Sequence, residues 1–115
     1  MIRILSSALV LLISSAVMAD NVSDAYSKVY ASGQVALDLQ KKCETSTQEM
    51  KLKSCKLAEA SYDKYQILAH SFMSSVEPKD LFNHVTPEQM NDLTSLNRKI
   101  GESMDKVTSR LNAHE

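Results

Sequence analysis

Apolar residues recur at alternating three- and four-residue intervals in three stretches of this chain. That spacing places them on one face of an α-helix, so the pattern predicts three amphipathic helices. We expect the first helix over residues 21–43, the second over 46–76 and the third from residue 86 onward. The expected inward residues are Val22, Tyr26, Val29, Gly33, Ala36, Gln40 and Cys43 in the first helix, Cys55, Ala58, Tyr62, Tyr65, Ala69, Phe72 and Val76 in the second, and Met90, Leu93, Asn97, Ile100, Met104, Val107 and Leu111 in the third.

Capping residues mark the expected starts of the second and third helices. Ser46 and Glu49 fit the S-x-x-E capping box, in which the two residues satisfy each other's free backbone amides. Thr86, Pro87 and Gln89 give a second start signal, because threonine caps, proline suits the first turn and glutamine closes the box. Both segments are therefore expected to open helices.

The segment between the second and third helices has a different character. Pro78 ends the second helix, and residues 77–85 are too apolar for a freely solvated loop. We expect them to form a short turn that folds over the open end of the bundle. On the third helix Asn97 is the one polar inward position, and a small rotation would let Leu96 take its place.

The two cysteines, Cys43 and Cys55, lie on the inward faces of the first and second helices. If they form a disulfide, antiparallel pairing places Gly33 opposite Tyr65, where a glycine would leave room for the ring. The closed loop is short, and its closure contributes about 3 kcal/mol in the chain-entropy model. The sequence therefore predicts an all-α fold, an antiparallel three-helix bundle whose first two helices are joined by a disulfide.

The N-terminus carries an export signal in this interpretation. Arg3 precedes an apolar, serine-containing run, and Ala19 ends a segment suited to signal peptidase. We expect a signal peptide at residues 1–19 and a helical bundle domain at residues 20–115, with an uncleaved anchor as the alternative. Export to the periplasm or beyond the cell would give an oxidising compartment, in which the cysteine pair forms a disulfide.

Charge indicates a binding surface rather than a nucleic-acid site. The formal net charge is −1, which does not favour nucleic-acid binding. Lys42, Lys51, Lys53 and Lys56 gather near the cysteines, and two of them lie early in a helix, where the dipole disfavours them. We interpret this basic end as the surface that steers an acidic protein partner. Ordinary solvation of the lysines is the alternative.

Apolar residues outside the three inward faces indicate a second surface. Leu52, Leu57 and Ile67 would form an apolar stripe if they stay exposed, suited to a protein partner or to a homodimer.

No group of residues demands a particular chemistry. The three histidines lack the spacing of metal ligands, and the C-x-x-C-H haem motif is absent. No nucleophile lies on a glycine-rich elbow. We therefore expect no catalytic residue, no metal site and no cofactor, and we interpret the protein as non-enzymatic.

Two short motifs resemble known families. The run from Cys43 to Met50, followed by Cys55 and by Tyr62-Asp63, resembles the opening of the LprI-like family of secreted lysozyme inhibitors. That resemblance implies inhibition of a cell-wall hydrolase. Thr86-Pro87-Glu88-Gln89 is similar to the L-T-x-x-Q motif of Spy-like periplasmic chaperones.

Together these features predict an exported protein-binding module of the bacterial cell envelope. The leading hypothesis is an inhibitor or immunity-type accessory factor whose partner is a cell-wall hydrolase or a toxin. The alternative is a periplasmic chaperone or stress protein that binds unfolded clients through exposed apolar helix surface.

Overall fold

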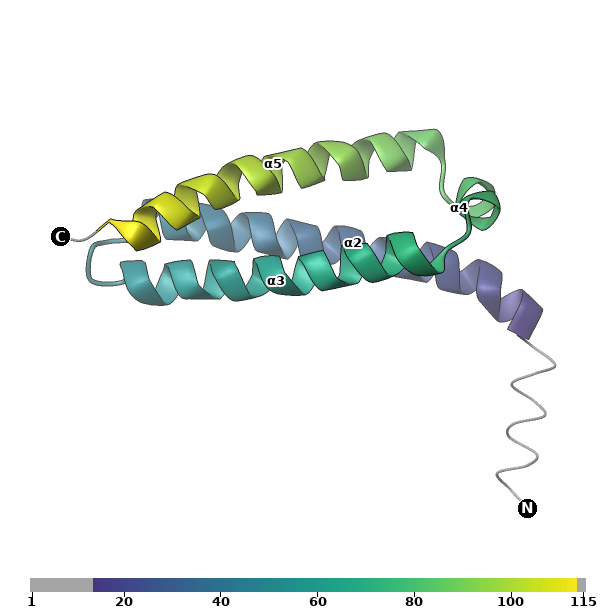
Figure 1. Cartoon of the computed structure of the whole chain (residues 1–115), viewed down its shortest axis with the longest axis horizontal. Helices are drawn as coiled ribbons and strands as arrows, with labels where there is room; N and C mark the ends of the chain where they lie inside the picture. Colours follow the sequence, from purple (N-terminus) through teal and green to yellow (C-terminus); the bar gives the residue numbers. More distant parts are fainter. Residues whose placement is uncertain (1–13, 114–115) are drawn as a thin grey trace, which may run out of the picture.

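The computed structural model describes residues 14–113, with side chains from residue 22 onward, and shows four α-helices and no strand in that range (Figure 1). They are α2 (Ser14–Thr45), α3 (Lys51–Ser75), α4 (Pro78–His84) and α5 (Pro87–Asn112). The expected all-α class is thereby confirmed. The predicted signal peptide lies mostly outside the described residues, and its last part, from Ser14, is the beginning of α2.

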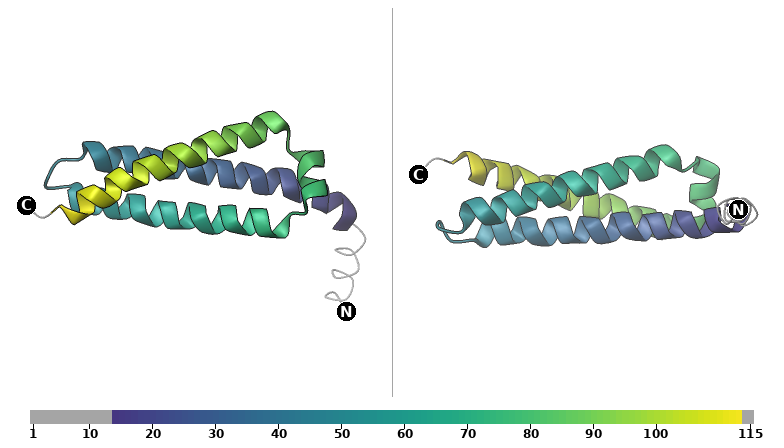
Figure 2. Two further views of the ribbon diagram at one scale, coloured as in Figure 1. Left: turned by 45° about the horizontal axis from the view of Figure 1, so that its top comes forward. Right: turned by 90° about the horizontal axis from the view of Figure 1, so that it is seen from below.

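The three long helices lie side by side, and α4 lies at one end of them (Figures 1 and 2). The turn between α2 and α3 is at the other end, close to the C-terminal end of α5. We call the end that holds this turn the disulfide end. Near α4, the Tyr26 hydroxyl donates to the Gln89 carbonyl at 2.7 Å, which fixes the start of α5 against α2.

The buried face of α2 is the one that the sequence predicts. All of its expected inward residues are buried, from Val22 to Cys43. Val22, Tyr26, Val29 and Ala36 belong to a large cluster that includes Ile100, and Cys43 belongs to a smaller cluster around the disulfide. Between Ala36 and Cys43 lies Gln40, which is fully buried.

The faces of α3 and α5 depart slightly from expectation. On α3 the inward residues are buried, except that Tyr62 and Ala69 are half-buried, as is Val76, which caps the end of the helix. On α5, Leu96 is buried and Asn97 is exposed, so the rotated alternative is confirmed. Asn97 still serves the core, because its Oδ1 accepts a hydrogen bond from the Tyr65 hydroxyl at 2.8 Å.

Three local expectations are wrong. The helix α2 begins at Ser14, well before the expected start, because the helix-forming residues ahead of Asn21 extend it without a break. The segment 77–85 contains the helix α4, since Pro78 occupies a first-turn position that tolerates proline. The capping box at Ser46 does not form, and α3 begins at Lys51.

The reason for the failed box is visible in the turn. The Ser46 hydroxyl donates to the Cys43 carbonyl at 2.7 Å, so this serine serves the end of α2. The Thr47 hydroxyl accepts from the Met50 amide at 3.2 Å. The second predicted start is confirmed, because Thr86 and Gln89 form a complete capping box at α5.

Candidate binding surface at the disulfide end

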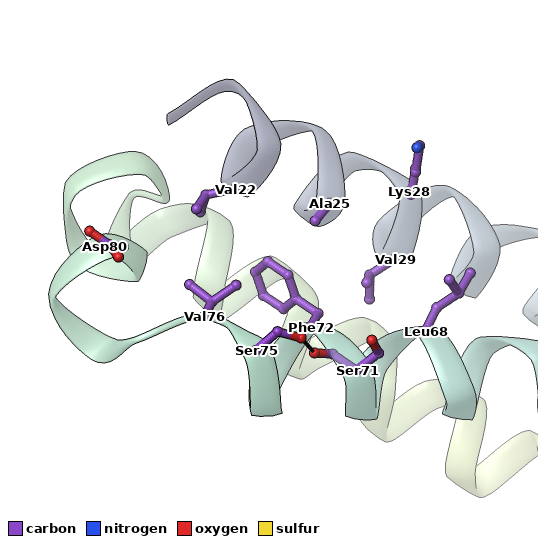
Figure 3. A pocket seen from close by; sticks show the side chains of 10 residues that line it. All are labelled: Val22, Ala25, Lys28, Val29, Leu68, Ser71, Phe72, Ser75, Val76 and Asp80. Carbon is purple, nitrogen blue, oxygen red and sulfur yellow. Dashed lines mark hydrogen bonds between the residues drawn. The ribbon is translucent and has the colours of Figure 1, made fainter. Parts of the chain in front are cut away.

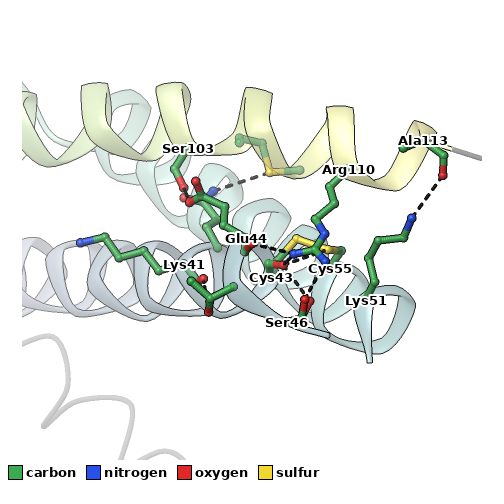
Figure 4. Close-up of a disulfide and its surroundings, with 12 residues drawn as sticks. Lys41, Cys43, Glu44, Ser46, Lys51, Cys55, Ser103, Arg110 and Ala113 are labelled. Atoms are coloured by element: carbon green, nitrogen blue, oxygen red, sulfur yellow. Dashed lines mark hydrogen bonds between the residues drawn. A yellow bond between two sulfur atoms is a disulfide. The ribbon is translucent and has the colours of Figure 1, made fainter. Parts of the chain in front are cut away.

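Cys43 and Cys55 form a disulfide between α2 and α3, as the sequence predicts (Figure 4). Their Cα atoms are 4.6 Å apart, and both side chains are fully buried. Ala58 and Val107 complete the buried cluster, with Met104 and Leu111 packed against it. The disulfide therefore lies inside a small apolar core to which all three long helices contribute.

Arg110 of α5 holds the C-terminal end of α2 (Figure 4). Its guanidinium donates to the carbonyls of Cys43, Glu44 and Ser46 at 2.7, 2.6 and 2.6 Å. The last carbonyls of a helix have no partner within the helix, and a cation there also opposes the negative end of the dipole. Arg110 thus supplies donors that the turn itself does not provide.

Glu44 connects the same helix end to α5 through its side chain. Its carboxylate accepts from the Ser103 hydroxyl at 3.0 Å and lies 3.7 Å from Lys106 Nζ. The Glu44 side chain is 26% exposed and that of Lys106 is 71% exposed, so this ion pair is screened on one side. Lys106 and Arg110 therefore lie at the disulfide end, and both are engaged within the protein.

The four lysines predicted to bind a partner fall into two groups. Lys51 Nζ donates to the Ala113 carbonyl at 3.2 Å, and Lys42 lies 3.4 Å from Asp38 on an exposed face. Lys53 and Lys56 are exposed, and within residues 22–113 no ion pair is formed by either. Of the predicted set, Lys53 and Lys56 are thus the lysines whose charge faces solvent without a carboxylate partner in that range.

Shallow cavities of mixed polarity lie between α2 and α5. One of about 410 Å³ is lined by Lys41, Glu44, Lys99, Glu102 and Lys106, with others. Another of about 430 Å³ includes Tyr30, Asp38 and Asp92. Both signs of charge line each cavity, so neither selects for one charge in a ligand.

A more apolar cavity lies between α2 and α3, next to α4 (Figure 3). Its volume is about 330 Å³, at the lower end of the range for small-ligand pockets. Its lining residues are Val22, Ala25, Lys28, Val29, Leu68, Ser71, Phe72, Ser75, Val76 and Asp80. No residue of α5 is among them, so this cavity opens on the side of α2 and α3 that α5 does not cover.

Several large apolar side chains are exposed. They are 45–72% exposed and comprise Val35, Met50, Leu52, Leu57, Ile67, Met73 and Phe82. Leu52, Leu57 and Ile67, the expected apolar stripe, are all among them. The exposure of Phe82 corrects an expectation, because an apolar segment folded over the open end of the bundle predicts that its apolar side chains are covered. Val85 of this segment is buried, whereas Phe82 is exposed.

Two tyrosines have perturbed titration. Burial raises the pKa of Tyr26 above its usual value, and the nearby Asp92 and Tyr30 add to the effect. Burial likewise raises the pKa of Tyr65, with a smaller contribution from Tyr62. Each phenol donates a hydrogen bond to a fixed acceptor, so both act as neutral structural donors.

No arrangement for metal chemistry is present in the described part of the chain: no three His, Cys, Asp or Glu side chains lie close enough together to hold an ion. Over that same part, no helix combines the length and apolarity needed to cross a bilayer. Comparison of the chain with protein-family models, curated proteins and solved structures gives no significant match.

Proposed function

We propose that this protein is an exported, non-enzymatic module that binds another protein through its disulfide end. The observation that carries the proposal is that the backbone of the α2–α3 turn is held in place while the charges of the neighbouring lysines Lys53 and Lys56 face solvent. The disulfide and Arg110 hold the α2–α3 turn in place. From the adjacent first turns of α3, Lys53 and Lys56 extend into solvent without an ion pair in residues 22–113.

A fixed backbone favours binding because less conformational freedom is lost when a partner docks. Exposed, unpaired lysines attract an acidic surface over a range of about 10 Å at moderate salt. Lys42 and Lys51 also lie at this end, but each interacts within the protein, Lys42 with Asp38 and Lys51 with the Ala113 carbonyl. We further infer that the three long helices form an antiparallel three-helix bundle, with α4 as an accessory helix at the far end.

The inhibitor or immunity-type role is the form of binding that we favour. The resemblance of the segment from Cys43 to Met50 to LprI-like lysozyme inhibitors implies a cell-wall hydrolase as the partner, and a toxin is the other candidate. Export follows from the predicted signal peptide, and the disulfide suggests a non-reducing environment. Residues 20–115 would then be the mature domain.

The test is partner capture from the native cell envelope at low and at high salt. The wild-type protein should retain one discrete partner at low salt and lose it as salt rises. Lys53→Glu/Lys56→Glu should abolish capture at low salt. Arg98→Glu/Lys99→Glu on α5 is the matched control, because it changes the net charge equally and leaves the disulfide end intact. Unchanged capture by the Lys53→Glu/Lys56→Glu variant would contradict the proposal.

A second candidate, a periplasmic chaperone, is favoured by the exposed apolar side chains. Ile67 and Phe82 are 69% and 72% exposed, which is high for large apolar residues without a partner. A chaperone should suppress aggregation of several unrelated unfolded proteins at near-stoichiometric ratios. Ile67→Gln/Phe82→Gln should lose that effect, whereas Lys53→Glu/Lys56→Glu should retain it. Absence of suppression by the wild-type protein excludes this candidate.

A further inference from the structure

The cavity between α2 and α3 is one part of a longer surface. Ala25 and Lys28 line it from α2, and Leu68 and Ser71 line it from α3. Continuing along α2 toward the disulfide end at intervals of four and three residues gives Ser32, Val35 and Leu39. Steps of four and three residues from Leu68 along α3, also toward the disulfide end, give Lys64, Ser61, Leu57 and Lys53. These positions therefore lie on the same faces of the two helices as the cavity.

The surface has an apolar centre and a basic rim. Val35 and Leu57 are 54% and 50% exposed, and Leu39 and Leu68 are half-buried beside them. We call these four residues together with the cavity the α2–α3 strip. On the α3 side of the strip the charged residues are Lys53 and Lys64, both of them lysines without an ion pair in residues 22–113.

The α2 side of the strip is close to neutral. Lys28 and Lys42 lie on it, and each pairs with an aspartate four residues before it, at 3.3 and 3.4 Å. Asp80 is the acidic residue among those lining the cavity, and it belongs to α4. Along the α3 rim the uncompensated charge is therefore positive, and Asp80, at the α4 end of the cavity, is the acidic lining residue without an ion pair in residues 22–113.

We propose that the α2–α3 strip docks an amphipathic helix of another protein, with its acidic side facing Lys64 and Lys53. The proposal rests on the proposed function and names the class of partner segment. Helix-in-groove recognition needs apolar anchors at helical spacing, and the cavity offers a place for one such side chain. The acidic side of the helix follows from the uncompensated lysines. A strip from Val22 to Leu39 matches a helix of roughly 17 residues at 1.5 Å per residue.

A second copy of this chain is a poorer occupant. In isologous pairing with the twofold axis across the strip, the two lysine-bearing α3 rims face each other, and like charges disfavour that interface. With the axis along the strip, each α3 rim faces the α2 side of the other copy, where the aspartates of the Lys28 and Lys42 pairs are already engaged.

The probe is a synthetic, fluorescein-labelled helical peptide of roughly 20 residues, with leucines at three- and four-residue spacing and glutamates along one flank. The control peptide carries lysine in place of each glutamate. Binding is measured by fluorescence anisotropy with the full mature chain. We expect the glutamate peptide to bind at least about tenfold more tightly than the lysine peptide at low salt.

Variants locate the site. Val35→Asn/Leu57→Gln should weaken binding of the glutamate peptide by about tenfold or more, since apolar anchors dominate such interfaces. Lys64→Glu should weaken it by roughly two- to fivefold, as exposed ion pairs do. Met73→Gln and Lys99→Glu are the matched controls outside the strip and should leave binding unchanged. All the substituted side chains are exposed, and thermal unfolding confirms that each variant is folded.

Three results would overturn the proposal: no binding of the glutamate peptide, equal binding of the two peptides, or equal losses in the strip and control variants. A dimer in solution that Val35→Asn/Leu57→Gln dissociates would also overturn it, by assigning the strip to self-association. The strip variants change Val35, Leu57 and Lys64, whereas the envelope-capture test changes Lys53 and Lys56, so the two proposals can fail separately. If Lys53→Glu/Lys56→Glu abolishes partner capture while the peptide result fails, the proposed function stands without this docking mode.

Discussion

Gly33 of α2 lies directly against the ring of Tyr65 on α3. A Cβ atom at Gly33 would be 3.0 Å from Tyr65 Cε1, 2.8 Å from Leu96 Cδ2 and 3.1 Å from Ile100 Cδ1. Such separations are shorter than ordinary contacts, so the absence of a side chain is what allows α2, α3 and α5 to approach each other here. Two of the residues that face Gly33, Tyr65 and Ile100, are buried core residues.

Gly33→Ala should therefore destabilise the protein. The gain in helix propensity is about 1 kcal/mol, whereas overpacking a core costs about 1–3 kcal/mol. We expect a net loss of up to about 2 kcal/mol in the free energy of unfolding, measured by urea denaturation. Gly101→Ala on α5 is the control, because no atom lies within 4 Å of its added Cβ. It should raise stability by about 0.5–1 kcal/mol. Equal effects of the two substitutions would contradict this account of the core.

Gln40 is a polar residue in a place that favours an apolar one. It is fully buried, its Nε2 donates to Met104 Sδ at 3.6 Å, and its Oε1 has no hydrogen-bond partner. A buried polar atom without a partner costs about 1–3 kcal/mol. We expect Gln40→Leu to raise the free energy of unfolding by about 1 kcal/mol, because the change in side-chain shape offsets part of the gain from removing the unpartnered oxygen. Gln34→Leu, at an exposed position of the same helix, should change it by less than about 0.5 kcal/mol.

Arg110 is expected to be the most sensitive surface-accessible residue. Arg110→Met removes the donor from three carbonyls, and a hydrogen bond to a charged group contributes about 1.5–3 kcal/mol net. Water can replace part of this set, because Arg110 is only partly buried. We expect a loss of about 2 kcal/mol in the free energy of unfolding, with faster amide hydrogen exchange at the end of α2. Arg110→Lys should recover only part of it, because an ammonium does not present the planar fork. Arg98→Met, an exposed arginine on the same helix, is the control, and an equal loss there would argue against a specific role for Arg110.

The raised pKa values of Tyr26 and Tyr65 predict alkaline destabilisation. The unfolded chain releases these phenol protons near pH 10, whereas the folded protein holds them to a higher pH. Their contribution to stability is thus complete below pH 10 and is lost as pH rises through the folded values. Urea denaturation at pH 8 and pH 11 should show a larger drop for the wild-type protein than for Tyr26→Phe/Tyr65→Phe. Equal drops would show that these phenols do not link pH to folding.

Much of the fold follows from residue spacing. The inward face of α2 is predicted completely, because three- and four-residue intervals fix which side of a helix is apolar. The disulfide and the contact of Gly33 with Tyr65 follow from pairing two such faces. The rotation that brings Leu96 inward is the alternative that the sequence allows, since leucine gains more from burial than Asn97.

Other features depend on contacts that spacing does not reveal. In the sequence Arg110 is one more basic residue of the third helix. Its role depends on where α5 meets the turn, far away along the chain. The same contacts redirect Ser46 from the start of α3 to the end of α2. Lys51 is likewise taken up by the Ala113 carbonyl, so the candidate surface shifts toward Lys53 and Lys56.

The central claim, that a protein partner contacts the disulfide end, is tested most directly by photo-crosslinking in native cells. A photoreactive amino acid is placed at position 56 on α3 or at position 91 on α5, at opposite ends of the molecule. Position 91 is exposed and does not line the cavity of the α2–α3 strip. The account predicts one adduct of discrete mass from position 56 and none from position 91. An adduct of equal yield from position 91, or a spread of many adducts from position 56, would contradict it.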